Sequence, residues 1–113
     1  MKRLLTLAAG LMALPTTAHA MTGNEILEFC GSNSQAVVAS CQTYIVGVTD
    51  GLTMSGVVNG TPILKLDGVT GIQQRDLLVS YLKQHPEIRH LAAAITIWDL
   101  FSKTFGTEII SSQ

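Results

Sequence analysis

One stretch of this sequence is so apolar that it determines how the rest of the chain must be arranged. Residues His85 to Phe105 are predicted to form a helix that begins at Pro86 and ends at Gly106. At about 100° per residue, the apolar side chains fill an arc of about 220°, roughly twice what a surface helix needs. We therefore expect this helix to be covered by its own chain, by a second copy, or by both. Three residues are left to face water: Thr96, Asp99 and Lys103.

A small domain is not expected to cover the whole of this arc, so the sequence predicts a homodimer. Ile97 and Leu100 lie at the far edge of the arc and are predicted to form the dimer seam. Trp98 and Phe101 are assigned to the core, and part of their surface is available to the same seam.

The first twenty residues have the three parts of a secretory signal peptide. Lys2 and Arg3 form the basic region, Leu4 to Leu14 the apolar region, and Ala18 to Ala20 a cleavage pattern. The apolar run breaks at Pro15, well short of the roughly 20 residues that a membrane anchor needs. We expect cleavage after Ala20, which leaves one small domain, residues 21–113, with no membrane segment.

The predicted mature chain is acidic. It keeps five of the seven basic residues and all eight acidic ones, hence a formal charge of −3. Nucleic acid is therefore not an expected partner.

Cys30 and Cys41 are the only cysteines, and an exported chain meets an oxidising compartment. The sequence therefore predicts a disulfide between them, with two free buried thiols as the alternative. Two thiols without a matching histidine pair do not make a zinc site, and no other metal or cofactor is expected.

The helical pattern predicts an all-α fold of four to five helices. Thr22–Glu25 and Thr70–Gln73 both have the capping-box pattern, and each opens a helix. A further helix starts near Ser34, and the helix from Thr70 ends before Pro86. The apolar face of the helix from Ser34 is formed by Val37, Cys41, Tyr44, Ile45, Val48 and Leu52.

The segment from Thr53 to Val69 has no helical period and is predicted to be one long irregular loop. Asn59-Gly60 suggests a small hairpin inside it, with Pro62 on an irregular strand. The tail from Thr107 to Gln113 is expected to be frayed.

No motif for catalysis is present, so the sequence does not predict an enzyme. It contains no nucleophile elbow, no glycine-rich phosphate loop and no metalloprotease helix motif. Glu87 and His90 match half of a di-iron motif, but a complete site needs a second copy and two further glutamates. We expect Glu87 to cap its helix instead.

Four segments together resemble the Rap/Tai family of immunity proteins: Thr22–Cys30, Cys41–Gly51, Gly68–Thr70 and Tyr81–Ala93. Many members of that family carry a second cysteine pair. The corresponding positions here are Thr61 and Gly106, so the long loop is expected to be freer than in those members.

This resemblance implies a periplasmic, helical and often homodimeric protein without catalysis of its own. It would bind a peptidoglycan amidase effector of a type VI secretion system and block its active site. The alternative is a periplasmic structural or adaptor protein on the same scaffold that inhibits no enzyme.

The long loop is the predicted inhibitory element, with an apolar tip that fills the amidase cleft. In the alternative, Ile63, Leu64 and Leu66 fold onto the helices as a lid, and helix surfaces around Asp50 or Asp76 bind the effector. The loop residues predicted to contact the partner are Asn59, Gly60, Ile63, Leu64, Lys65 and Asp67.

Overall fold

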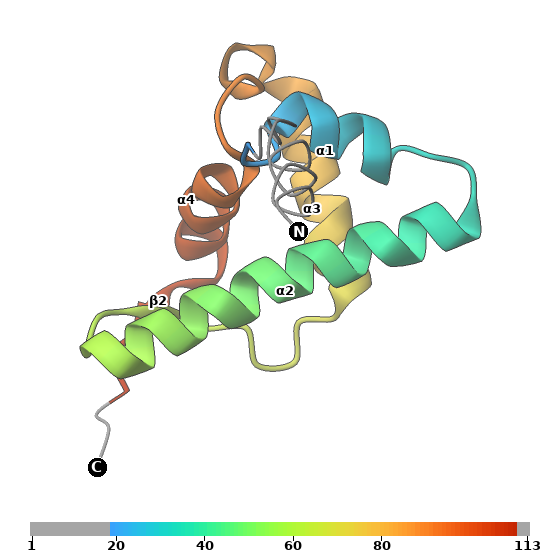
Figure 1. Ribbon diagram of the computed structural model, residues 1–113. Helices are drawn as coiled ribbons and strands as arrows, with labels where there is room; N and C mark the ends of the chain where they lie inside the picture. The colour runs from blue at the N-terminus through green and yellow to red at the C-terminus, as the bar shows by residue number, and fades with distance from the viewer. Residues whose placement is uncertain (1–18, 111–113) are drawn as a thin grey trace, which may run out of the picture.

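The longest element is helix α2 (Gln35–Asn59), which crosses in front of the other helices in Figure 1. The computed structural model describes residues 19–110. This part of the chain is mainly helical, which confirms the predicted all-α fold with one disulfide. The other elements are α1 (Gly23–Cys30), β1 (Ile63–Leu64), α3 (Gly71–Gln84), the 3-10 helix η2 (Pro86–Ile88), α4 (Ala93–Phe105) and β2 (Thr107–Glu108).

Both predicted capping boxes are present. The Thr22 hydroxyl accepts a hydrogen bond from the Glu25 N–H, and the Glu25 carboxylate accepts one from the Thr22 N–H. Thr70 and Gln73 repeat this arrangement at the start of α3. Each box satisfies main-chain donors that a helix start otherwise leaves without partners, and so fixes where α1 and α3 begin.

The predicted disulfide joins the end of α1 to the buried side of α2. Cys30 and Cys41 are both fully buried, and their Cα atoms lie 5.3 Å apart. The Arg75 guanidinium of α3 donates to the Cys30 carbonyl at 3.1 and 3.3 Å. Three helices are therefore fixed to one another at this corner.

The core lies between these elements. Helices α1, α2 and α3 pack on one another, and α4 packs on α2 and β1. Trp98 is partly buried against this core, whereas Phe101 lies fully within it. The core residues are Ile26, Cys30, Cys41, Ile45, Leu64, Leu78, Val79, Leu82, Ala93, Ile97, Leu100 and Phe101.

The last helix is shorter than predicted, because α4 begins at Ala93 and not near His85. The N-terminal segment bonds to the main chain ahead of it: the Gly23 N–H donates to the Leu91 carbonyl and the Ala93 N–H to the Met21 carbonyl. These bonds place Ala92 in an isolated bridge with Thr22, and Ala92 has an extended main chain (φ −59°, ψ 131°). Pro86 opens only the short 3-10 helix η2.

Two residues, Arg89 and Gly23, keep this junction tight. The Arg89 guanidinium donates to the carbonyls of Leu82 and Lys83 at the end of α3. Gly23 lies so close that an added Cβ would stand 3.1 Å from the Arg89 main chain. The close approach of the N-terminal segment therefore depends on a residue without a side chain.

The buried sector of α4 also differs from the prediction. Thr96, expected to face water, is 3% exposed, while Ile95, expected to be covered, is 60% exposed. The chain covers the sector around Ala93, Ile97 and Leu100, and Thr96 borders that sector on the helix surface. The wide apolar arc is thus covered at one edge and open at the other.

Helix α2 continues through Thr53–Asn59, which were predicted to be irregular, and no Asn59-Gly60 hairpin forms. Gly60 adopts φ +66° as the left-handed residue that ends the helix. The Asn59 side chain donates to the Ser55 carbonyl, one turn back. An Asn-Gly pair suits either a hairpin turn or a helix end, and here it forms the helix end.

The C-terminal segment is paired rather than frayed at Thr107 and Glu108, because β2 runs antiparallel to β1. The Lys65 N–H also donates to the Gly106 carbonyl at 3.1 Å. Main-chain pairing therefore holds the segment after Thr61 beside the segment after Gly106. The β1 end of the loop is therefore held by main-chain pairing in a chain that lacks the second cysteine pair.

Most of the predicted signal peptide, and residues 111–113 of the tail, lie outside the described residues. His19 and Ala20, at the predicted cleavage site, are exposed. Within residues 19–110, no helix is both long enough and apolar enough to cross a membrane.

Candidate partner-binding surface

The predicted apolar tip of the long loop is buried. Ile63 is 5% exposed and Leu64 is 4% exposed, and together they form β1 against α2 and α4. Leu66 is partly buried against the same core. The loop therefore forms the lid that the sequence allowed as the alternative, and the prediction of a protruding apolar tip is wrong.

The other predicted loop residues remain on the surface. Asn59 and Gly60 end α2 and are exposed, as are Lys65 and Asp67. Asp67 and Gly68 form a turn in which the Val69 N–H donates to the Leu66 carbonyl, with Gly68 at φ +77°. The exposed part of the loop is thus polar, and it leads directly into α3.

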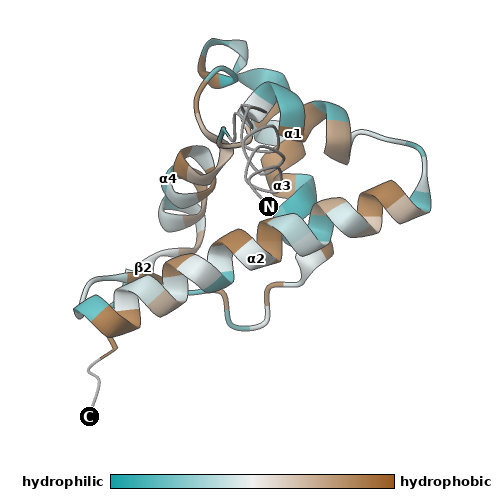
Figure 2. Ribbon diagram, viewed as in Figure 1, coloured by the Kyte–Doolittle hydropathy of each residue, from teal (hydrophilic) through white to brown (hydrophobic). Residues whose placement is uncertain are grey.

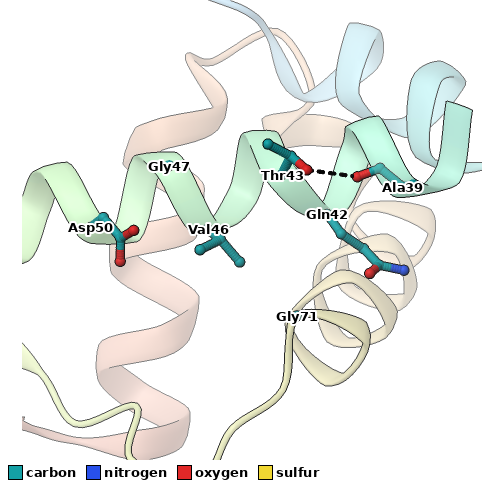
Figure 3. A pocket seen from close by; sticks show the side chains of 7 residues that line it. All are labelled: Ala39, Gln42, Thr43, Val46, Gly47, Asp50 and Gly71. Atoms are coloured by element: carbon teal, nitrogen blue, oxygen red, sulfur yellow. Dashed lines mark hydrogen bonds between the residues drawn. The ribbon is translucent and has the colours of Figure 1, made fainter. Parts of the chain in front are cut away.

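Beside the start of α3, the surface of α2 carries a shallow depression of about 470 Å³. Figure 3 shows the side chains of Gln42, Val46 and Asp50 pointing from one side of α2 towards the segment that enters α3. Helix α2 supplies most of the lining and α3 supplies one residue. The lining residues are Ala39, Gln42, Thr43, Val46, Gly47, Asp50 and Gly71.

Two glycines keep this depression open. An added Cβ at Gly47 would meet nothing within 4 Å, whereas one at Gly71 would stand 3.5 Å from Val46. The Thr43 hydroxyl donates to the Ala39 carbonyl of its own helix at 3.0 Å (Figure 3). What the surface offers a partner is therefore a flat stretch of main chain, the Val46 side chain, and the polar groups of Gln42 and Asp50.

The exposed side of α2 is nearly uncharged over its whole length. Figure 2 shows few strongly hydrophilic residues along the middle of this helix. Its exposed residues follow helical spacing, and Asp50 is the single ionisable one among them. They are Gln35, Ala36, Ala39, Ser40, Thr43, Gly47, Asp50, Gly51, Met54, Ser55, Val58 and Asn59.

Within residues 19–110, no basic side chain pairs with Asp50. Three of the five basic residues in this range bond elsewhere. Arg75 and Arg89 donate to main-chain carbonyls, and the Lys103 ammonium pairs with Asp99 at 2.9 Å. That hydrogen bond to Asp99 raises the pKa of Lys103.

The predicted dimer seam does not lie on the surface of the chain. Ile97 is fully buried and Leu100 is 8% exposed, both within the core of their own chain. They are therefore unavailable to a second copy, because the covered sector of α4 is centred on them. The exposed apolar residue of α4 is Ile95.

Glu87, which with His90 matches half of a di-iron motif, bonds to a nearby histidine instead. The Glu87 carboxylate bonds to the His85 Nδ1 at 2.9 Å, and its pKa is lowered by a main-chain hydrogen bond and by His85. His90 is exposed. In the part of the chain that the structure describes, no group of three or more potential metal ligands lies together.

The sequence pointed to Asp50 only as an alternative, and it did not identify the depression beside it. Gly47 was the available signal, since a glycine inside an exposed helix weakens that helix. Among the residues that the structure describes, nothing lies within 4 Å of a Cβ added at Gly47. Gly71 was not singled out at all, because the depression forms only when α3 lies beside α2.

Comparison with known proteins gives one finding. The model of the family described as Rap1a immunity proteins matches residues 22–106, most of the chain. No curated protein and no solved structure matches this sequence.

Proposed function

This chain belongs to the Rap1a immunity protein family, and from that premise we propose that it binds and inhibits a peptidoglycan amidase effector of a type VI secretion system. In this proposal the chain acts in the periplasm by covering the active site of the effector. It carries out no catalysis of its own. The single observation that carries the proposal is the family match over residues 22–106.

Export is part of the proposal, with residues 1–20 removed as a signal peptide. The Cys30–Cys41 disulfide supports an oxidising compartment, because cytosolic proteins rarely keep structural disulfides. The family match begins at residue 22, directly after the proposed cleavage site. Mass spectrometry of the protein recovered from periplasm is expected to show a chain that starts at Met21.

We propose that the effector binds the side of α2 that carries Asp50, together with the exposed turn at Asp67 and Gly68. The depression on this side of α2 is open, and the turn leads into α3, whose first residue, Gly71, lines the depression. Ile63 and Leu64 are buried in β1 and are not part of the proposed contact. Lys65 is exposed beside them, and Asn59 and Gly60 end α2 outside the lining of the depression.

A loop deletion is a poor test of this surface, because removing residues 59–67 would also remove β1 from the core. The double variant Lys65→Ala with Asp67→Ala changes only exposed side chains. We expect this variant to stay folded and to bind the effector more weakly. Equal inhibition by the variant and the unmodified chain would exclude these two residues from the contact.

The function itself is tested by searching the genes beside this one for an exported amidase and by using that enzyme as the effector. Cells that direct this amidase to the periplasm are expected to survive when the chain is co-expressed, and the purified enzyme is expected to be inhibited at equimolar chain. Binding without inhibition would support the adaptor role instead. Lysis with full amidase activity in the presence of the chain would contradict the proposal.

Homodimerisation also remains a proposal. A second copy would meet Ile95 on α4, which is 60% exposed, and not Ile97 or Leu100. Sedimentation of the unmodified protein is expected to show a dimer that Ile95→Glu converts to monomer. A monomer at high micromolar concentration would exclude this dimer.

A further inference from the structure

The depression on α2 carries one formal charge, and that charge has no partner in the described chain. Of its seven lining residues only Asp50 is ionisable, and no lysine or arginine of residues 19–110 pairs with it. A carboxylate and an amide oxygen on the same surface are both hydrogen-bond acceptors. The chemistry of the depression therefore favours a ligand that is cationic and carries several donors.

The shape of the depression favours a ligand with an apolar stem. Its lining combines the Val46 side chain with the bare main chain at Gly47 and Gly71. Long basic side chains lay their methylene groups on such surfaces while the charged end reaches a polar partner. A small hydrated cation would leave this apolar part without a contact.

The residues that the structure describes leave the depression unfilled at Gly47. Gly47 weakens an exposed helix relative to alanine. Nothing within 4 Å of its position requires the missing side chain. Contact with a partner protein would explain why the surface is left open at Gly47.

We propose that this depression receives an arginine side chain of the effector, with the guanidinium bonded to Asp50 and its methylene groups lying on Val46 and Gly47. This inference rests on the proposed function, because it names the chemistry of the same contact. Arginine suits the depression better than lysine, since its planar group presents five donors and is weakly hydrated. The formal charge of −3 on the mature chain attracts a basic partner at longer range.

The first experiment uses a peptide and does not need the effector. The probe is the capped tripeptide Gly-Arg-Gly, and its control is the same peptide with neutral citrulline in place of arginine. Amide chemical shifts of the protein purified from the periplasm are recorded during titration. We expect saturable shifts at Gly47, Asp50 and Gly71 with the arginine peptide, and none with the citrulline peptide.

Two pairs of variants test whether the arginine peptide binds in the depression. Asp50→Asn removes the charge of the depression, while Glu28→Gln removes one exposed charge on α1 as its control. Gly47→Leu fills the depression, while Gly51→Leu makes the same change one turn further along α2, outside the lining. An added Cβ meets nothing within 4 Å at either glycine, so both leucine variants are expected to fold.

The peptide response is expected to disappear in Asp50→Asn and Gly47→Leu and to persist in Glu28→Gln and Gly51→Leu. With the neighbouring amidase, Asp50→Asn is expected to weaken binding about tenfold, as the loss of one charge-assisted hydrogen bond does. Glu28→Gln is expected to change binding by less than about twofold.

Equal shifts with both peptides, or shifts confined to other residues, would overturn the inference. So would full inhibition of the amidase by both Asp50→Asn and Gly47→Leu, although the proposed function would then still stand. If the unmodified chain fails to inhibit the amidase while the arginine peptide binds at Asp50, the proposed function fails and the cation-binding chemistry of the depression is retained.

Discussion

Helix α2 packs against the rest of the chain along one side, with close contacts near both ends, and its opposite side is open in between. Near its start, the Cys30–Cys41 disulfide ties it to α1, and near its end Gly56 lies against β1. Between these points, Gly47 and Gly51 have nothing within 4 Å of an added Cβ. The same helix thus contains glycines that packing requires and glycines that packing does not require.

Two glycines of α2 therefore differ in what surrounds them: Gly56 packs against β1, whereas Gly47 lies on the surface proposed to bind the effector. At Gly56 an added Cβ would overlap the Ile63 side chain and stand 3.0 Å from the carbonyl oxygens of Thr61 and Pro62. At Gly47 it would enter the depression beside Asp50. Changes at the two ends are therefore expected to lower stability, whereas changes on the open side in the middle are expected to lower binding without lowering stability.

The largest effect is expected from the disulfide. Replacing Cys30 and Cys41 by alanine is expected to lower the free energy of unfolding by about 3 kcal/mol, because the bridge restricts the unfolded chain. Urea unfolding of the two proteins measures this difference. A loss below about 1 kcal/mol would show that other contacts fix this end of α2.

Gly56→Ala is expected to lower stability by about 2 kcal/mol, since Ile63 and the main chain beneath it must move. Gly51→Ala serves as the matched control on the same helix. If both variants unfold at the same urea concentration, α2 is no more tightly packed at Gly56 than at Gly51.

Gly47→Ala and Gly51→Ala are each expected to raise the free energy of unfolding by about 0.5–1 kcal/mol. Both positions are exposed, and alanine is the better helix former. Thermal unfolding measures the gain. A decrease in the free energy of unfolding of either variant would reveal a close contact in the middle of α2. It would contradict the claim that this side of the helix is open.

The smallest effect is expected from Glu25, which lies outside α2. Hydrogen bonds from the main chain and the side chain of Thr22 lower its pKa. Its contribution to stability is therefore present above the unfolded-state pKa and is lost as the pH falls through the lower folded-state value. Glutamine keeps the capping box without titrating, so Glu25→Gln is expected to lose less stability than the unmodified chain between pH 7 and pH 3.

Equal acid sensitivity of the two proteins would exclude Glu25 from this effect. Because Glu25 is on α1, the loss of its charge is expected to leave the open middle of α2 unchanged. Arginine-peptide binding by Glu25→Gln at pH 7 is the control, and it should match that of the unmodified chain.

The parts of the fold that sequence reasoning predicted correctly are encoded by neighbouring residues. Thr22 and Glu25 form a capping box through bonds between residues three positions apart. Cys30 and Cys41 had no other cysteine to pair with. These features needed no knowledge of which distant segments meet.

Two predictions of helix bounds were wrong. Residues 53–59 lack a clear helical period but continue α2, whereas residues 85–92 suit a helix but form no α-helix. In the second case Met21 and Gly23 bond to the main chain near Leu91. Contacts between distant segments thus overrode the local preference.

The candidate surface was only partly predictable for the same reason. Asp50 and Gly47 lie on one helix, but Gly71 joins them only when α3 packs on α2. The burial of Ile63 and Leu64 depends on pairing with Thr107 and Glu108, more than forty residues further along the chain. Alternation of apolar and polar residues within the loop gave no sign of that pairing.

The central claim is that the effector binds the open middle of α2. Hydrogen–deuterium exchange of the chain, alone and with the neighbouring amidase, tests it most directly. The account predicts slower exchange in the complex at residues 42–51 and 66–71, with little change at residues 56–64. Protection confined to residues 56–64, with unchanged exchange around Asp50, would contradict it.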